Sequence, residues 1–279
     1  MTNTVPNYTL NNGVTIPQEG FGVFRVDPDK TGRIVRDALE VGYRHIDTAA
    51  IYKNEEGVGH AIAQAAKDGL VEREDLFITT KLWNSDQTNA TPAFEKSLGR
   101  LGLDYVDLYL IHWPTPERGT FIEAWKTLEQ IYATGLVKSI GVSNFTVPQL
   151  EQLLAETSIV PAVNQIELHV DFQQPELRAF HAAHGIATEA WGPLGHGTIN
   201  GSPELAAIAD AHQKSVAQTV LRWQLQIGNI LIPKSNSRER QAENLDIYDF
   251  ELTADELATI ATLDRGDEGR NGGHPLEVN

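Results

Sequence analysis

The strongest constraint on the fold is a unit that repeats along the chain. In each copy an amphipathic segment of helical character ends at a glycine, and a short apolar segment of strand character follows. Glycine suits this place because it adopts the left-handed conformation that ends a helix without a Cβ clash. Six glycines stand between such a helix and such a strand: Gly42, Gly69, Gly102, Gly135, Gly185 and Gly228.

Two further apolar segments, 20–24 and Val163–Glu167, complete a set of eight predicted strands. Strands that alternate with helices form a parallel sheet, and eight such units in 279 residues fit a closed barrel better than a doubly wound sheet. No linker or change of composition divides the chain. We therefore predict an α/β fold, a (β/α)8 TIM barrel, as one domain over residues 1–279. The other strands are expected at residues 45–47, 77–81, 106–112, 139–143, 187–190 and 230–232.

Both ends of the chain lie outside this pattern. The segment Tyr8–Ile16 alternates apolar and polar residues around Asn12-Gly13, a pair typical of a type I′ turn, and predicts an N-terminal β-hairpin. The tail Asp264–Asn279 is rich in glycine and charge, and we expect it to lie over one mouth of the barrel.

Composition excludes several classes of function. The net charge of −16 opposes binding to nucleic acid or to anionic membrane surfaces. The absence of cysteine excludes disulfides, thiolate nucleophiles and cysteine-ligated zinc. No apolar stretch approaches the roughly 18 residues of a membrane span, and no signal peptide is evident, so we expect a cytoplasmic protein.

Polar residues stand where the predicted strands end, and in a barrel of this kind those ends carry the chemistry. Asp47, Lys81 and His112 end the second, third and fourth strands, and Tyr52 follows Asp47 in the next loop. An ammonium group beside a tyrosine favours the phenolate, so Lys81 should lower the pKa of Tyr52, while Asp47 holds the lysine charged. A neutral His112 could orient a carbonyl oxygen. The set suits proton donation to an oxygen, and a hydride cofactor would supply the electrons.

The best signal for that cofactor is the basic segment 232–244, which places Lys234, Arg238 and Arg240 around the start of a helix. A helix N-terminus binds phosphate through its free N–H groups. No G-x-G-x-x-G motif follows a strand, so a Rossmann domain is not indicated. A solvated charged loop remains the alternative for this segment.

Each of these residues also has an ordinary structural explanation. Asp47 could cap a helix, Lys81 could be a surface charge, and His112 could be a hydrogen-bonded structural histidine. Tryptophans usually pack in the core, but Phe24, Trp83, Trp113 and Trp191 all fall on strand-end loops and could instead wall an apolar pocket.

Four segments together resemble the aldo-keto reductase family, and the likeness covers essentially the whole chain. They are Gly42–Ala49, Leu108–Pro114, Ser139–Phe145 and Ile232–Ser235. The resemblance implies an NADPH-dependent reductase of aldehydes and ketones, active as a monomer. The pattern is most similar to the bacterial members that reduce 2,5-diketo-D-gluconate at C5, which implies α-dicarbonyl or keto-sugar substrates. Two alternatives stay open: a low-turnover barrel that senses NADP(H) for regulation, and a metal-dependent isomerase or hydrolase.

The resemblance also implies roles for single residues. Asp47, Tyr52, Lys81 and His112 match the catalytic tetrad, with Tyr52 as the general acid. The residues that match the cofactor site are Ser143, Asn144 and Gln165 for the nicotinamide carboxamide; Trp191 for stacking on the ring; Leu194 and Gly195 for the pyrophosphate; Lys234, Ser235, Asn236, Ser237 and Arg240 for the 2′-phosphate; and Glu243 and Asn244 for the adenine. Phe24, Trp83 and Trp113 match the wall of the substrate pocket. No metal site is expected.

Overall fold

The computed structural model describes residues 5–279, without the side chains at positions 196, 198 and 200. Eight parallel strands form one sheet in which each strand pairs with its neighbour in the chain. They are β3 (Phe21–Gly22), β4 (His45–Asp47), β5 (Phe77–Leu82), β6 (Val106–Ile111), β7 (Val137–Ser143), β8 (Val163–Glu167), β9 (Ala187–Trp191) and β10 (Ile230–Leu231).

The sheet closes on itself where the first strand meets the last. A parallel bridge joins Glu19 to Leu231, and the N–H of Gly20 donates to the carbonyl of Leu231 at 2.8 Å. The predicted (β/α)8 barrel is therefore confirmed. β4 and β8 have the predicted bounds, whereas β3 and β10 are shorter than predicted because the closure between them rests on few ladder hydrogen bonds.

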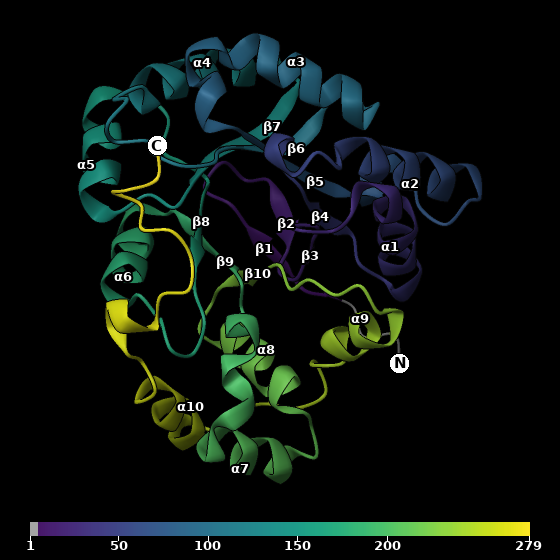
Figure 1. Ribbon diagram of the computed structural model, residues 1–279, viewed down its shortest axis with the longest axis vertical. Helices are drawn as coiled ribbons and strands as arrows, with labels where there is room; N and C mark the ends of the chain where they lie inside the picture. The colour runs from purple at the N-terminus through teal and green to yellow at the C-terminus, as the bar shows by residue number, and fades with distance from the viewer. Residues whose placement is uncertain (1–4) are drawn as a thin grey trace.

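Helices surround the barrel as an outer ring (Figure 1). They are α1 (Pro28–Val41), α2 (Glu55–Lys67), α3 (Ala90–Leu101), α4 (Phe121–Ala133), α5 (Val147–Glu156), α6 (Pro175–His184), α7 (Pro203–His212), α8 (Val216–Gln226), α9 (Arg238–Leu245) and α10 (Ala254–Ala261). All six glycines of the repeating unit have positive φ, which confirms the signal from which the repeat was derived.

The N-terminal hairpin pairs β1 (Asn7–Thr9) with β2 (Thr15–Pro17), as predicted. The turn type is not the predicted one: Gly13 has φ +84°, but Asn12 is not among the residues with positive φ, as a type I′ turn requires. Asn12 is instead fixed by its side chain, which accepts from the N–H of Val14 at 3.2 Å and donates to the carbonyl of Lys138 at 3.0 Å. The N–H of Leu10 donates to the carbonyl of Val14 at 2.8 Å, so three residues lie inside the turn, and Asn12 ties them to the barrel.

The hairpin closes the end of the barrel at which the strands begin. Leu10 and Ile16 are buried against an apolar layer inside the barrel that consists of Phe77, Leu108, Leu110, Ala162, Val163, Ala187 and Ile230. Burying each of these two side chains contributes about 1.5–3 kcal/mol. The hairpin therefore forms an apolar cover over this end of the barrel.

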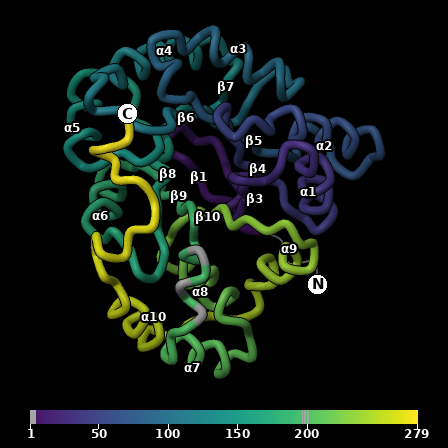
Figure 2. The backbone as a smooth tube through the Cα atoms, viewed as in Figure 1, coloured from purple at the N-terminus to yellow at the C-terminus, as the bar shows by residue number. Residues whose placement is uncertain are grey.

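The C-terminal tail crosses the opposite mouth, as predicted. The carboxylate of Glu167 accepts from the backbone N–H of Asn271 at 2.7 Å and of Gly272 at 2.9 Å. A Cβ on Gly272 would lie 2.4 Å from the indole of Trp191, so only glycine fits this contact. Figure 2 shows the tail running from α10 past α6 to the C-terminus near α5.

Among the described residues, no helix is long and apolar enough to cross a membrane.

Candidate active site

The four predicted catalytic residues meet at the C-terminal mouth because their strands are parallel and neighbouring. Asp47 is the last residue of β4, Lys81 lies near the end of β5, and His112 directly follows β6. Tyr52 ends a short 3-10 helix, η1 (Ala50–Tyr52), in the loop after β4. The ammonium of Lys81 donates to Asp47 Oδ1 at 2.6 Å and to Tyr52 Oη at 3.4 Å.

Lys81 is completely buried, which excludes the alternative that it is an ordinary surface charge. A third bond, from its ammonium to the carbonyl of Thr48 at 2.9 Å, uses its remaining donor. Burial opposes the charged form and is the largest single effect, but the neighbouring groups, with Asp47 first among them, together outweigh it and raise the pKa of Lys81. The lysine is therefore a fixed positive charge beneath the tyrosine hydroxyl.

The pKa of Tyr52 differs from the expectation drawn from the sequence. Lys81 does favour the phenolate, but burial of the hydroxyl has the larger effect and raises the pKa of Tyr52 above its ordinary value. The prediction that the pKa of Tyr52 is lowered is therefore wrong for the net shift. The phenol holds its proton at neutral pH, and the nearby ammonium is placed to stabilise the phenolate once that proton has left.

His112 lies against Tyr52 and Trp83, with ring centroids 5.6 and 5.2 Å away and near-perpendicular planes. Burial, with a smaller contribution from Lys81, lowers its pKa well below the usual value, so the imidazole is neutral. Its Nδ1 is buried and unpartnered within residues 5–279, whereas Nε2 is not among the enclosed atoms. Nε2 is therefore the nitrogen that a ligand at the mouth could reach.

The four rim aromatics are not core residues. Phe24 is 48% exposed and packs on Tyr52 with ring centroids 5.1 Å apart. Trp83, Trp113 and Trp191 are half-buried. Phe24 therefore lies directly against Tyr52, and Trp83 lies against His112.

A second polar group joins the tetrad on the side of β7 and β8. Ser143 Oγ donates to the carbonyl of Gln165 at 2.8 Å, and Asn144 Nδ2 donates to that of His112 at 3.0 Å. The indole N–H of Trp191 donates to Asn144 Oδ1 at 2.8 Å. Gln165 Nε2 reaches Asp47 Oδ2 at 2.8 Å. The structure therefore brings these four predicted cofactor residues into one network with the tetrad.

The remaining predicted cofactor residues lie on two segments outside this network. Leu194 and Gly195 follow β9, and Leu194 packs on the core while Gly195 begins a 3-10 helix, η4 (Gly195–Gly201). The others lie between β10 and the end of α9. Lys234, Asn236, Arg240 and Glu243 are exposed, Ser237 is half-buried, and Ser235 and Asn244 are buried.

The start of α9 has free cations. Ser237 caps the helix by accepting from the N–H of Arg240 at 3.4 Å. Arg238 forms an ion pair with Glu40, but among residues 5–279 neither Lys234 nor Arg240 takes part in one. These two positive side chains, with the free N–H groups of the helix, suit a phosphate group.

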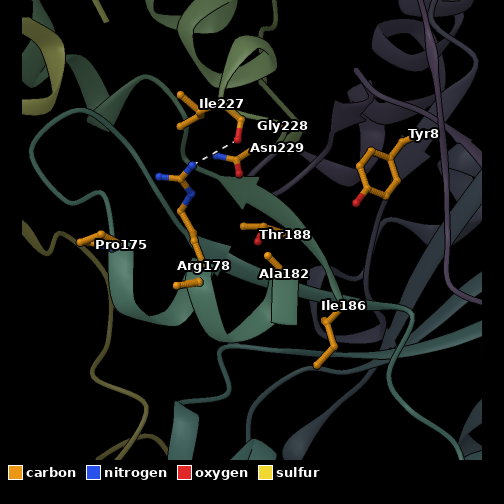
Figure 3. A pocket seen from close by; sticks show the side chains of 10 residues that line it. Tyr8, Pro175, Arg178, Ala182, Ile186, Thr188, Ile227, Gly228 and Asn229 are labelled. Carbon is orange, nitrogen blue, oxygen red and sulfur yellow. Dashed lines mark hydrogen bonds between the residues drawn. The ribbon is translucent and has the colours of Figure 1, made fainter. Parts of the chain in front are cut away.

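A cavity on another part of the molecule lies away from this site. It has a volume of about 350 Å³ and lies between Tyr8 of the hairpin, Arg178 of α6 and the turn Ile227–Asn229 (Figure 3). None of the predicted site residues lines it. A cavity of about 30 Å³ does reach the mouth, where Asn144 and Trp191 face the tail. The chemistry of the side chains, and not cavity size, identifies the site.

Sequence analysis missed two buried residues below the tetrad, Glu189 and His45. Gln165 Nε2 donates to Glu189 Oε2 at 2.6 Å, and Glu189 Oε1 lies 3.5 Å from His45 Nε2. Burial lowers the pKa of His45 to about 3. Burial, reinforced by the Asp47 carboxylate, raises the pKa of Glu189 far above its ordinary value. An acidic residue within the apolar segment Ala187–Trp191 was the available signal.

Comparison with known proteins agrees with this geometry. Residues 19–265 match the aldo/keto reductase family. An aldo-keto reductase of Mycolicibacterium smegmatis is 52% identical over 263 residues, 94% of each chain. The methylglyoxal reductase DkgA of Yersinia pestis is 50% identical over 263 residues, also 94% of each chain. A crystal structure of a Gox0644 variant in complex with NADPH has a TM-score of 0.93 at 44% identity and covers 99% of both chains.

Proposed function

This chain is a member of the aldo/keto reductase family, and we propose that its substrates are short α-dicarbonyl compounds, of which methylglyoxal is the first candidate. The general activity is NADPH-dependent reduction of a carbonyl group. The observation that carries the narrower proposal is the 50% identity to a methylglyoxal reductase over nearly the whole of both chains. Keto sugars such as 2,5-diketo-D-gluconate, reduced at C5, are the second candidates.

The residues at the mouth fit the cofactor. The half-buried indole of Trp191 offers a face on which a nicotinamide ring can stack, and Gln165, Ser143 and Asn144 surround it with polar groups. Lys234 and Arg240 at the start of α9 suit the 2′-phosphate, with Ser235, Asn236 and Ser237 beside them. Leu194 and Gly195 would flank the pyrophosphate, and Glu243 and Asn244 the adenine. Bound NADPH supplies the hydride that reduces the carbonyl carbon.

Tyr52 is the proton donor in this proposal. Its Oη gives a proton to the carbonyl oxygen as negative charge develops there, and the ammonium of Lys81, 3.4 Å away, stabilises the phenolate that remains. Asp47 holds that ammonium through a 2.6 Å bond. The neutral His112 orients the same oxygen through Nε2. Phe24, Trp83 and Trp113 exclude water and hold the apolar part of the substrate.

The test is a screen of NADPH consumption with methylglyoxal, glyoxal, 2,5-diketo-D-gluconate and simple aldehydes. We expect the largest kcat/KM with a vicinal dicarbonyl. A preference for unrelated aldehydes would contradict the substrate proposal. Cofactor binding without turnover in excess over enzyme would favour a sensing role. A cytoplasmic, single-domain monomer stays a prediction of the sequence.

A further inference from the structure

The orientation of one amide at the mouth is fixed by two carboxyl groups. Gln165 Nε2 donates to Asp47 Oδ2 at 2.8 Å and to Glu189 Oε2 at 2.6 Å. Only the NH₂ group of the amide can donate a hydrogen bond to a carboxyl oxygen that accepts one. The two carboxyl groups therefore fix the positions of the nitrogen and the oxygen in the Gln165 side chain. The two N–H groups of this nitrogen are both used inside the barrel.

The oxygen of the same amide therefore faces the other way. Gln165 Oε1 accepts no hydrogen bond from residues 5–279, and it is not one of the enclosed unpartnered atoms. The side chain is only 2% exposed, so the small accessible part lies at the mouth. The exposed end of Gln165 is thus an acceptor.

We propose that Glu189 is a positioning residue, which holds Gln165 so that its Oε1 can accept the carboxamide N–H of a bound nicotinamide. This inference rests on the proposed cofactor site. Among the described residues, the side chain of Glu189 forms no hydrogen bond with any of the four tetrad residues. The one hydrogen bond of its side chain within the described residues is the bond to Gln165.

The surroundings of Glu189 explain how an acidic residue can serve here. It is completely buried, as is His45 on the facing side, and Glu189 Oε1 and His45 Nδ1 are both unpartnered in the described part of the chain. Gly20 leaves the room for this ring, since a Cβ there would lie 2.5 Å from His45 Nδ1. Burial raises the pKa of Glu189, which favours its neutral form, and Glu189 Oε1 lies 3.5 Å from Nε2 of the neutral His45.

A neutral acid has a close substitute in glutamine. In Glu189→Gln the amide oxygen can accept from Gln165, as Glu189 Oε2 does. In Glu189→Leu this bond is not possible, and Gln165 keeps only its bond to Asp47. The two variants have similar volume and differ in hydrogen bonding.

The experiment is a fluorescence titration of NADPH and of adenosine 2′,5′-bisphosphate, which lacks the nicotinamide, against each variant. We expect Glu189→Leu to weaken NADPH binding about two- to tenfold, the range for one neutral hydrogen bond. Binding of the bisphosphate should be unchanged. Glu189→Gln should bind both as the wild type does.

A cycle with Gln165→Leu then separates positioning from folding. If Glu189 acts through Gln165, adding Glu189→Leu to Gln165→Leu should cost no further affinity for NADPH. An equal loss in both backgrounds, an equal loss for the bisphosphate, or failure of Glu189→Gln to restore binding would overturn the proposal. A wild type that binds neither ligand would instead overturn the cofactor site itself.

Discussion

The barrel interior and the start of α9 present polar groups in opposite ways. Inside the mouth, Lys81, Asp47 and Gln165 are buried and joined by hydrogen bonds of 2.6–2.8 Å. At the start of α9, Lys234 and Arg240 are exposed and form no ion pair within residues 5–279. The first region is assembled by the fold, whereas the second offers side chains that only a ligand would order.

The difference in burial between the two regions predicts that one affects the reaction rate and the other affects the affinity for a phosphate group. The buried groups of the tetrad interact in a low dielectric and lose no side-chain entropy when the reaction proceeds, so they should govern the rate of the chemical step. Exposed cations are screened by salt and must be ordered, so they govern how tightly a phosphate is held. Substitutions in the two regions should therefore change different measured quantities.

The largest effect is expected at Tyr52. Tyr52→Phe removes the hydroxyl and little else, so kcat should fall about 10²–10⁴-fold, the usual contribution of a positioned acid. Affinity for NADPH should be nearly unchanged. Steady-state kinetics and a cofactor titration measure both, with Tyr8→Phe in the distant hairpin as the matched control. A Tyr52→Phe enzyme within twofold of wild-type turnover would contradict the assignment.

Lys81→Met should reduce kcat about as severely, because the phenolate of Tyr52 loses its stabilising charge. Removing the lysine also leaves Asp47 buried without its partner, which costs stability, so thermal unfolding must be checked first. The double variant with Tyr52→Phe should be little slower than either single variant, since the two groups act as a unit. Fully multiplicative losses would mean that they act independently.

A smaller effect, of another kind, is expected at Arg240. A charge-assisted hydrogen bond is worth about 1.5–3 kcal/mol, so Arg240→Ala should weaken NADPH binding roughly ten- to a hundredfold and leave kcat at saturation unchanged. Affinity for NADH, which lacks the 2′-phosphate, should hardly change. Titrations of both cofactors at low and high salt measure this.

Arg238→Ala is the matched control for Arg240→Ala. It lies in the same turn, but its guanidinium is already paired with Glu40, so its loss should affect NADPH binding less. Equal losses for NADPH and NADH in Arg240→Ala would show that this arginine supports the helix and not the 2′-phosphate.

The smallest effect on activity is expected at Glu19, which lies outside both regions. Burial raises the pKa of Glu19 to about 8, although Tyr248 and Tyr43 donate to it. Between the ordinary carboxyl pKa and about 8, the folded protein keeps a proton that the unfolded chain has lost. The contribution of Glu19 to the free energy of unfolding should therefore fall as pH rises through that window, by at most about 1.4 kcal/mol per unit.

Glu19→Gln removes that titration and should flatten the slope while leaving turnover unchanged. Urea unfolding across the window from 4.5 to about 8 measures it. Glu151→Gln, at an exposed position on α5, is the control and should keep the wild-type slope. An unaltered slope in Glu19→Gln would mean that Glu19 is ionised in the folded protein.

The fold and the tetrad could be predicted because both follow from local signals. A glycine at each helix end marked the repeat, and the ends of parallel strands must meet at one mouth. Glu189 could have been found as well: alternate residues of a strand share a face, so a strand that places Trp191 at the mouth also turns Glu189 inward. Glu189 was not predicted because it lies inside a strand, whereas the chemistry of a barrel is expected at the strand ends.

Other features depend on closure of the barrel and left no local signal. The pKa of Tyr52 rises because the assembled mouth buries its hydroxyl, and the sequence shows only the neighbouring lysine. The predicted type I′ turn of the hairpin was wrong because the side chain of Asn12 donates to the carbonyl of Lys138, a residue far along the chain. The contact of Gly272 with Trp191 likewise joins segments that nothing in the sequence connects.

The bridge between Glu19 and Leu231 has a consequence for how the chain folds. It joins residues near opposite ends of the sequence, whereas every other strand pairing in the barrel links consecutive strands. Contacts between distant residues form slowly because a long loop must first be closed. Consecutive units can assemble as the chain emerges during synthesis, but the cylinder cannot close until its last strand is available. The pairing of Glu19 with Leu231 should therefore form late in folding, and it should break early in unfolding.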